Sequence, residues 1–144
     1  MKSILGRSLG LGVKGNLEGN DIDITPKCAD ASITVGDEAT NVRAITIQLK
    51  DANGDDIDYA EQVLITLYAD AAKAAYVTTG GSTGIEIGTD GALLALVAKK
   101  VFLATSEADG DLDLTWTDTG TEAAYLALTL PNGRTIMSDA LTNA

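Results

Sequence analysis

The chain has 144 residues, of which 45% are hydrophobic, and its 21 acidic and 10 basic side chains give a net charge of −11 at pH 7. This length predicts one domain with a sizeable core, and the acidic balance disfavours nucleic acid and membrane surfaces as partners. The chain contains no histidine, which excludes Ser-His-Asp and Cys-His catalysis and imidazole ligation of zinc. We therefore expect a non-enzymatic protein with no catalytic residue, metal or cofactor.

Residues 1–30 differ in composition from the rest of the chain. Glycines stand at positions 6, 10, 12, 15 and 19 without a regular period, and Pro26 follows, which predicts an extended N-terminal arm. The first 14 residues contain three cations and no acid. Their spaced aliphatic side chains are unusual for a solvated linker, so we expect the arm to dock on a partner. The predicted partner-binding residues are Lys2, Ile4, Leu5, Arg7 and Leu9.

Two N-terminal motifs have simpler interpretations than their patterns suggest. The first seven residues begin like a signal peptide, but glycines interrupt the apolar stretch that should follow, so we expect a protein made and used without secretion. Gly10–Gly15 matches the dinucleotide pattern GxGxxG, which requires a strand before it and a helix after it. Neither is predicted here, so the glycines are attributed to the arm.

From residue 31 onward, apolar residues alternate with polar ones at the spacing of short, half-buried strands. The first three predicted strands present one apolar face each, formed by Ile33 and Val35, by Ile45, Ile47 and Leu49, and by Val63, Ile65 and Leu67.

The middle of the chain is less regular. Residues 76–79 could form a strand, 80–84 a glycine-rich loop, and Ile85 with Ile87 another short strand. Residues 91–98 fit both a strand and a helical period, and we favour a strand or irregular segment. Leu112, Leu114 and Trp116 then alternate with acids and threonines, which predicts a strand with a charged outer face and with Trp116 in the core.

Three segments are predicted to be β-hairpins. The C-terminal one turns at Pro131–Gly133, between residues 123–130 and 134–139. A second runs from Val42–Lys50 through the turn at residues 51–56 to 62–69. A third runs from residues 102–106 through Asp109 and Gly110 to 112–118.

Together these elements predict an all-β protein, an immunoglobulin-like antiparallel β-sandwich over residues 31–144 preceded by the arm over residues 1–30. The single cysteine, Cys28, cannot form an internal disulfide. We expect it to be a buried and unreactive thiol, because no histidine is present to activate it.

The loop after the second strand has an alternative interpretation as a calcium site. Its oxygen-bearing side chains are dense, but the glycine stands two positions early for an EF-hand and no glutamate closes the loop. Asp and Asn are also ordinary turn formers. The hairpin turn is therefore favoured over a weak calcium site formed by Asp51, Asn53, Asp55, Asp56 and Asp58.

Paired carboxylates and exposed aromatic rings are the other chemical features to consider. A carboxylate pair can hydrolyse glycosides, but the acids here fall in turns or on outer strand faces, where nothing in the sequence predicts a raised pKa. Tyr59 and Tyr76 are possible contacts for a glycan if they are exposed in loops.

Several stretches of this sequence resemble known domains. Residues 44–54 look like the strand and turn of bacterial immunoglobulin-like (Big-type) domains, and residues 104–110 resemble a later hairpin of the same domains. Residues 125–134 and 138–142 are similar to small immunoglobulin-like proteins of tailed bacteriophage virions. The resemblance covers residues 32–142 and is most specific at the turns.

This resemblance implies a structural virion protein, most simply a capsid decoration protein anchored by its arm. Its expected partner is the major capsid protein or another virion protein, with no nucleic acid or membrane. The expected location is the capsid surface, after synthesis in the host cytoplasm. Arms clustered in a homo-oligomer, most simply a trimer, would add avidity. The alternatives are a host-surface or glycan-binding adhesion module and a tail or head-to-tail connector component.

Overall fold

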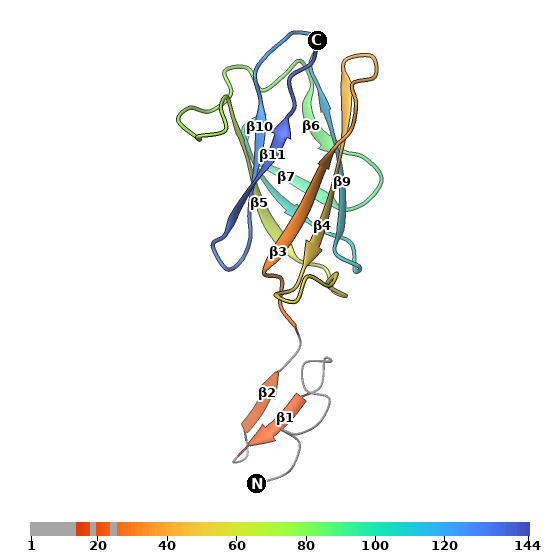
Figure 1. The fold of residues 1–144 in the computed structure, drawn as a ribbon, viewed down its shortest axis with the longest axis vertical. Coiled ribbons are helices and arrows are strands. Elements are labelled where there is room, and N and C mark those ends of the chain that lie inside the picture. Colours follow the sequence, from red (N-terminus) through yellow and green to blue (C-terminus); the bar gives the residue numbers. More distant parts are fainter. Residues whose placement is uncertain (1–13, 18–19, 24–25) are drawn as a thin grey trace.

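The computed structural model describes residues 14–17, 20–23 and 26–144 (Figure 1). In these residues every regular element is a β-strand, and no helix long and apolar enough to cross a membrane occurs among them. The strands are β1 Lys14–Leu17, β2 Asn20–Asp23, β3 Asp30–Val35, β4 Val42–Lys50, β5 Gln62–Tyr68, β6 Gly84–Ile87, β7 Ala92–Val97, β8 Val101–Thr105, β9 Asp111–Thr117, β10 Tyr125–Thr129 and β11 Thr135–Ala140.

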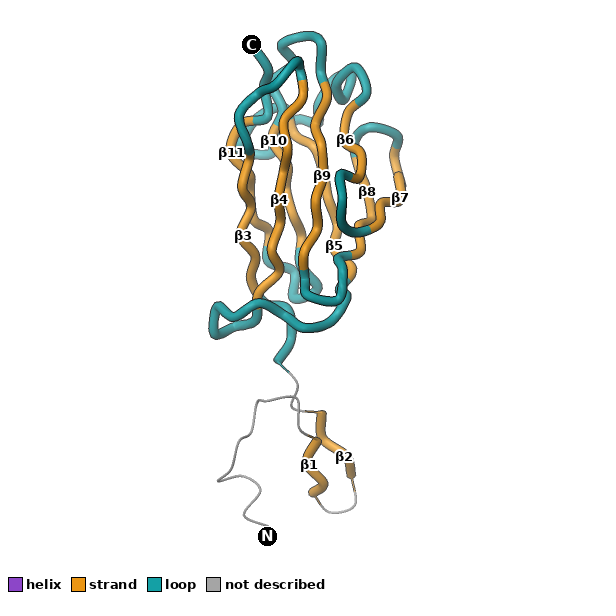
Figure 2. The backbone as a smooth tube through the Cα atoms, turned by 90° about the vertical axis from the view of Figure 1, so that its right-hand side faces the viewer, coloured by secondary structure: helices purple, strands orange, loops and turns teal. Residues whose placement is uncertain are grey.

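Nine of these strands form two antiparallel sheets that face each other. The five-stranded sheet has the order β11-β10-β5-β8-β7, and the four-stranded sheet has the order β3-β4-β9-β6. Figure 2 shows β3, β4, β9 and β6 side by side. The predicted all-β, immunoglobulin-like sandwich is confirmed.

The core lies between the two sheets and is built from alternate residues of the long strands. Trp116, in β9, is fully buried, as is Leu128, in β10, so Trp116 lies in the core as predicted. The other fully buried large side chains come from both sheets: Ile45, Ile47, Leu49, Val63, Ile65, Leu67, Leu112, Leu114, Leu126 and Leu141.

The C-terminal hairpin forms as predicted. β10 pairs with β11, and Leu130 and Arg134 close the turn through a hydrogen bond from the Leu130 amide to the Arg134 carbonyl. Gly133 has a φ of +85°, a conformation that suits glycine and explains its place in the turn. The Asn132 side chain accepts a hydrogen bond from the Arg134 amide at 2.9 Å.

The other two predicted hairpins are wrong. β4 pairs with β3 and β9, whereas β5 pairs with β10 and β8, so residues 51–61 cross from one sheet to the other. β8 and β9 likewise belong to different sheets. Alternation specifies which face of a strand is buried, and strands in either sheet bury that face in the same core. The strand positions were therefore predictable, but their pairing was not.

The middle of the chain contains two of the three short strands considered. β6 contains Ile85 and Ile87, and residues 92–97 form β7, a strand as favoured over a helix. Residues 76–79 are not a strand, because Tyr76 forms only an isolated bridge with Tyr68. Val77 nevertheless lies in the core, which explains the apolar character of that segment.

The described part of the N-terminal region is not simply extended. β1 and β2 pair antiparallel, with Lys14 opposite Asp23 and Leu17 opposite Asn20. Glycine-rich composition disfavours strands, yet four paired residues on each side are enough for this small hairpin. The division of the chain into an arm over residues 1–30 and a domain over 31–144 stays a prediction; the first strand of the sandwich, β3, begins at Asp30.

Candidate functional site

The outer face of the five-stranded sheet carries a continuous set of uncharged side chains. Strand pairing places them in rows: Thr129, Leu64, Leu103 and Leu94 lie opposite one another across four strands, followed by Ala127, Thr66, Val101 and Val97, and then by Tyr125 and Tyr68. They lie on the outer side of the sheet because the alternate residues of the same strands fill the core. Thr66 and Ala127 are nevertheless buried. We call the following set the uncharged face: Leu64, Thr66, Tyr68, Tyr76, Leu94, Val97, Val101, Leu103, Tyr125, Ala127 and Thr129.

One end of the uncharged face is well exposed to solvent. The ring of Tyr76 stacks on that of Tyr68, with centroids 5.3 Å apart and an angle of 11° between the planes. Tyr76 is 55% exposed, Leu94 60% and Val97 51%. A pocket of about 130 Å³ lies between Tyr76, Val97, Lys100 and Val101. Exposed apolar side chains gathered in this way are typical of a binding surface.

The outer face of the four-stranded sheet has the opposite character. Its rows pair Gln48 with Asp111, Thr46 with Asp113, and Thr115 with Glu86. We call this the acidic face, and it confirms the charged outer surface predicted for β9. The two sheets therefore share one core but present different surfaces to solvent.

The uncharged face could have been predicted from a sequence feature other than the alternation of apolar and polar residues. In β5, β7 and β8, apolar residues occupy both phases of the strand, as in the sequences QVLITLY, ALLALV and VFLAT. Only one phase can face the core of a two-layer sandwich. The second apolar phase must therefore lie on the outer surface, or beneath a partner.

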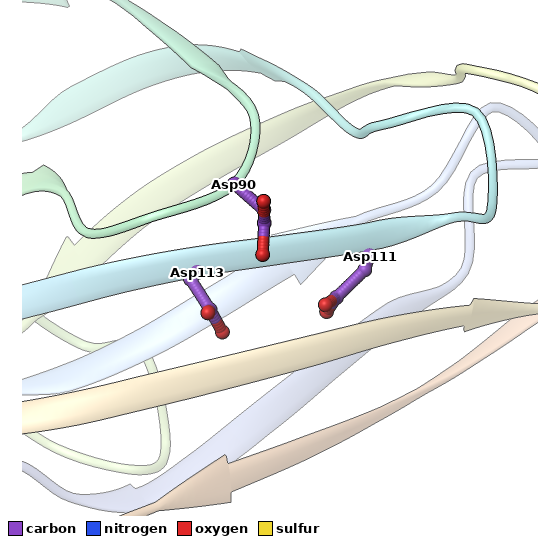
Figure 3. Close-up of side chains that lie close together, drawn as sticks. All are labelled: Asp90, Asp111 and Asp113. Atoms are coloured by element: carbon purple, nitrogen blue, oxygen red, sulfur yellow. The ribbon is translucent and has the colours of Figure 1, made fainter.

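Three acids meet where the connection between β6 and β7 lies against β9. The carboxylates of Asp90, Asp111 and Asp113 have oxygens within 4.8 Å of one another (Figure 3). The Thr89 hydroxyl donates to Asp113 at 2.5 Å, and the Asp113 amide donates to the Asp90 carbonyl at 2.9 Å. Three carboxylates could contribute to a calcium site, although calcium takes six to eight oxygen ligands.

Asp111 has a raised pKa that nothing in the sequence predicted. Partial burial, together with the negative charge of Asp113, raises the pKa of the Asp111 carboxyl. Because the pKa is higher in the folded chain than in the unfolded one, ionised Asp111 opposes folding, and this opposition is relieved as the pH falls through the folded pKa.

Replacing Asp111 by asparagine should therefore raise the melting temperature at pH 7, by roughly 1 to 3 °C for a domain of this size. Asparagine keeps an oxygen that can accept the hydrogen bond from the Leu112 amide. Differential scanning calorimetry with Asp37→Asn as the control checks this. If calcium stabilises the wild type and Asp111→Asn removes that effect, the three acids are ligands instead.

The loop at residues 51–58 has the geometry of a turn. Asp51 is buried, and its Oδ1 accepts hydrogen bonds from the amides of Asn53 at 2.8 Å and Asp55 at 3.1 Å. Gly54 has a φ of +90°. Asp56 pairs instead with Lys50 at 2.7 Å. These contacts support the turn over the calcium alternative, because the Asp51 oxygen is already used by backbone donors.

An open groove of about 720 Å³ lies beside this loop and the start of β7. Its lining is strongly acidic and contains no cation. The Gly91 amide, directly before β7, donates to Glu107 at 3.2 Å. We call this the acidic groove; it is lined by Gln48, Asp56, Ile57, Asp58, Asp90, Glu107, Ala108 and Asp109.

Glu122 holds a loop at the other end of the sandwich. One carboxylate oxygen accepts the amides of Thr78 at 2.6 Å and Thr79 at 2.8 Å, and the other accepts the Thr79 hydroxyl at 2.7 Å and the Gly81 amide at 2.9 Å. Burial on its own would raise the pKa of Glu122, but these hydrogen bonds outweigh it and lower the pKa to about 2. The carboxylate is therefore a structural anchor.

The predicted partner-binding residues, Lys2, Ile4, Leu5, Arg7 and Leu9, lie outside the described residues. Of the two tyrosines considered for glycans, Tyr59 packs against the core and its hydroxyl accepts a hydrogen bond from the Cys28 amide at 2.6 Å. Only Tyr76 is an exposed ring. Cys28 is buried as predicted, and burial with the nearby charge of Glu61 raises the pKa of its thiol, which keeps it protonated.

Comparisons with known proteins assign no family to this chain. No protein-family model matches this chain, and no curated protein matches it. Among solved structures it is similar to a cohesin module from Clostridium perfringens ATCC13124 family 33 glycoside hydrolase, with 18% identity and a TM-score of 0.44 over 82% of this chain and 97% of that chain. At this level of similarity, no binding partner or activity follows for this chain.

Proposed function

We propose that this chain is a non-enzymatic β-sandwich module whose protein partner lies against the uncharged face. The observation that carries the proposal is the contrast between the two sheets, one with an uncharged and partly apolar outer surface and one with an acidic surface. The centres of protein interfaces are depleted in charge and enriched in aromatic residues. Tyr68, Tyr76 and Tyr125 all lie on this one face.

The specific role that we propose is capsid decoration in a tailed bacteriophage, with the major capsid protein or another virion protein as partner. The resemblance of residues 125–134 and 138–142 to small immunoglobulin-like proteins of tailed bacteriophage virions supports this role. A one-sided charge distribution also suits a protein that lies on a particle, since the uncharged face can turn inward and the acidic face outward. The arm, with Lys2, Ile4, Leu5, Arg7 and Leu9, adds a second anchor.

Binding to particles that lack the protein tests this role. The double variant Tyr76→Lys/Leu103→Lys should reduce occupancy at least tenfold, because two charges would be buried without partners. Deleting residues 1–14 should also abolish incorporation while leaving the melting curve of the sandwich unchanged. Occupancy is measured by cryo-electron microscopy and by gel densitometry of purified particles.

Thr46→Lys, on the acidic face, is the matched control and should bind normally. Full occupancy by the double variant would show that the uncharged face is not the anchor. Full occupancy by the protein that lacks residues 1–14 would show that the arm is not needed as an anchor. The images would also separate decoration, with copies across the capsid lattice, from a connector component, which would form a ring at one vertex or in the tail.

Glycan binding is a second candidate, favoured by one observation. Tyr76 is an exposed ring held flat against Tyr68, and such a platform can stack on the face of a sugar. In this case a polysaccharide would bind the protein in the absence of particles, and Tyr76→Ala would abolish that binding.

A further inference from the structure

The two sheets have four edge strands, and β7 differs from the other three. β3 contains Asp30, β6 contains Glu86 and β11 contains Asp139, whereas β7 (ALLALV) has no charged residue and no proline. Charges and prolines on edge strands prevent other chains from pairing with them. In the described part of the chain, β7 is therefore the edge strand without that protection.

β7 is also well exposed. Leu94, Leu96 and Val97 are each more than half exposed, and β8 is the one strand among those described that pairs with β7. The register shift between Ala95 and Val97 comes only near its end, so Ala92–Ala95 presents regular backbone. Such an edge can accept a further strand through backbone hydrogen bonds, with side-chain contacts adding specificity.

The chain itself contains a segment with matching chemistry. In residues 8–13, Leu9, Leu11 and Val13 alternate with Ser8, Gly10 and Gly12, which as a strand would give one apolar face and one face with Ser8 as its only side chain. Arg7 and Lys14 flank the segment. Residues 1–25 contain equal numbers of acids and cations, so the net charge of −11 belongs to residues 26–144.

Charge complementarity favours β7 as the place where this segment would bind. The acidic groove begins at Asp90, two residues before β7. Whichever direction an added strand took, one of its flanking cations, Arg7 or Lys14, would lie at the end of β7 that is near the acidic groove.

A neighbouring copy is the better source of the segment than the same copy. The N-terminal region joins the sandwich at β3, which lies near β11, whereas β7 lies at the opposite side near β6 (Figure 2). A segment from the same copy would have to pass around the sandwich to reach β7. A segment from a neighbouring copy is free of that constraint.

We propose that residues 8–13 of one copy add as a strand to the β7 edge of a neighbouring copy. The contact is head-to-tail, so it closes into a ring or extends as a chain, and a trimer is one closed form. The proposal names the partner of the arm in the proposed function, but it is tested in solution without particles. If the protein does not bind particles, the proposal of self-association through β7 is unaffected. If the protein does not self-associate, the proposal that a partner binds the uncharged face is unaffected.

Sedimentation of the full-length protein over a range of concentrations is the first test. The wild type should form oligomers, and Leu96→Lys and Leu9→Asp/Leu11→Asp should each raise the dissociation constant at least tenfold. Thr46→Lys is the control and should sediment like the wild type. A second measurement mixes two full-length chains of different mass, one with Leu11→Cys and one with Leu96→Cys, and treats them with a short bismaleimide crosslinker. We expect the mixed crosslinked product.

Three results would overturn the proposal. One is a wild type that stays monomeric at all concentrations. The second concerns a further chain that carries both Leu11→Cys and Leu96→Cys. If the mixed product does not form and this chain gives only a crosslink within one molecule, the segment lies on its own β7. The third is loss of association in Tyr76→Lys but not in Leu96→Lys, which would assign self-association to the uncharged face. Melting curves confirm that every variant is folded.

Discussion

Replacing Leu128 by alanine should lower the free energy of unfolding by about 2 to 5 kcal/mol. Leu128 is fully buried in β10, opposite Ile65 of β5 on one side and Ile136 of β11 on the other. Removing its side chain leaves a cavity in the core, where the strands on both sides of β10 limit collapse. Urea denaturation of both proteins measures the difference.

Leu94→Ala is the matched control, since Leu94 lies in the same sheet but is 60% exposed. At low protein concentration it should change stability by less than about 0.5 kcal/mol. A loss of similar size in the two variants, or a loss below about 0.5 kcal/mol for Leu128→Ala, would contradict the placement of Leu128 in the core.

Replacing Glu122 by glutamine should cost about 1 to 3 kcal/mol at pH 7, the range for hydrogen bonds to a charged acceptor, reduced by solvent at this partly exposed site. Glutamine has one acceptor oxygen where the carboxylate has two. The amides of Thr78, Thr79 and Gly81 and the Thr79 hydroxyl would then compete for it. The loop at residues 78–81 should loosen as a result.

The pH dependence of this effect has a definite sign. The pKa of Glu122 is about 2 in the folded chain, below its ordinary value of 4.5. Its stabilising contribution is therefore complete above about pH 4.5 and is lost as the pH falls toward 2. The difference between wild type and Glu122→Gln should shrink over that range in denaturant titrations at several pH values. Glu86→Gln, on the acidic face, is the control, and a constant difference from pH 7 to pH 2 would contradict the role of the charge.

The strands of the sandwich were largely predictable because each buries one face. The predicted strand Val42–Lys50 has the same bounds as β4, and Trp116 lies where its phase with Leu112 and Leu114 places it. Pairing was less predictable. Residues 51–61 and 106–110 contain turn-forming residues and look like hairpin connections, but turn chemistry is the same whether the chain returns to its own sheet or crosses to the other.

The candidate site was harder to predict than the fold. The sequence drew attention to the arm, because its charge and glycine content differ from the rest of the chain. The uncharged face depends on knowing that Leu64, Leu103 and Leu94 lie opposite one another, which is a property of strand order. Glu122 was missed for a similar reason: its partners lie more than 40 residues away in the sequence.

The separation of charge between the two sheets has a consequence for any particle that this protein covers. With the uncharged faces turned inward, a layer of copies would present Asp111, Asp113 and Glu86 to the medium. Physiological salt screens the repulsion between neighbouring acidic faces beyond about 8 Å, so dense coverage is possible under these conditions. As the salt concentration is lowered, the repulsion extends further and coverage should decrease. Coated particles should also move faster toward the anode than bare ones, and their electrophoretic mobility would then report how completely they are covered.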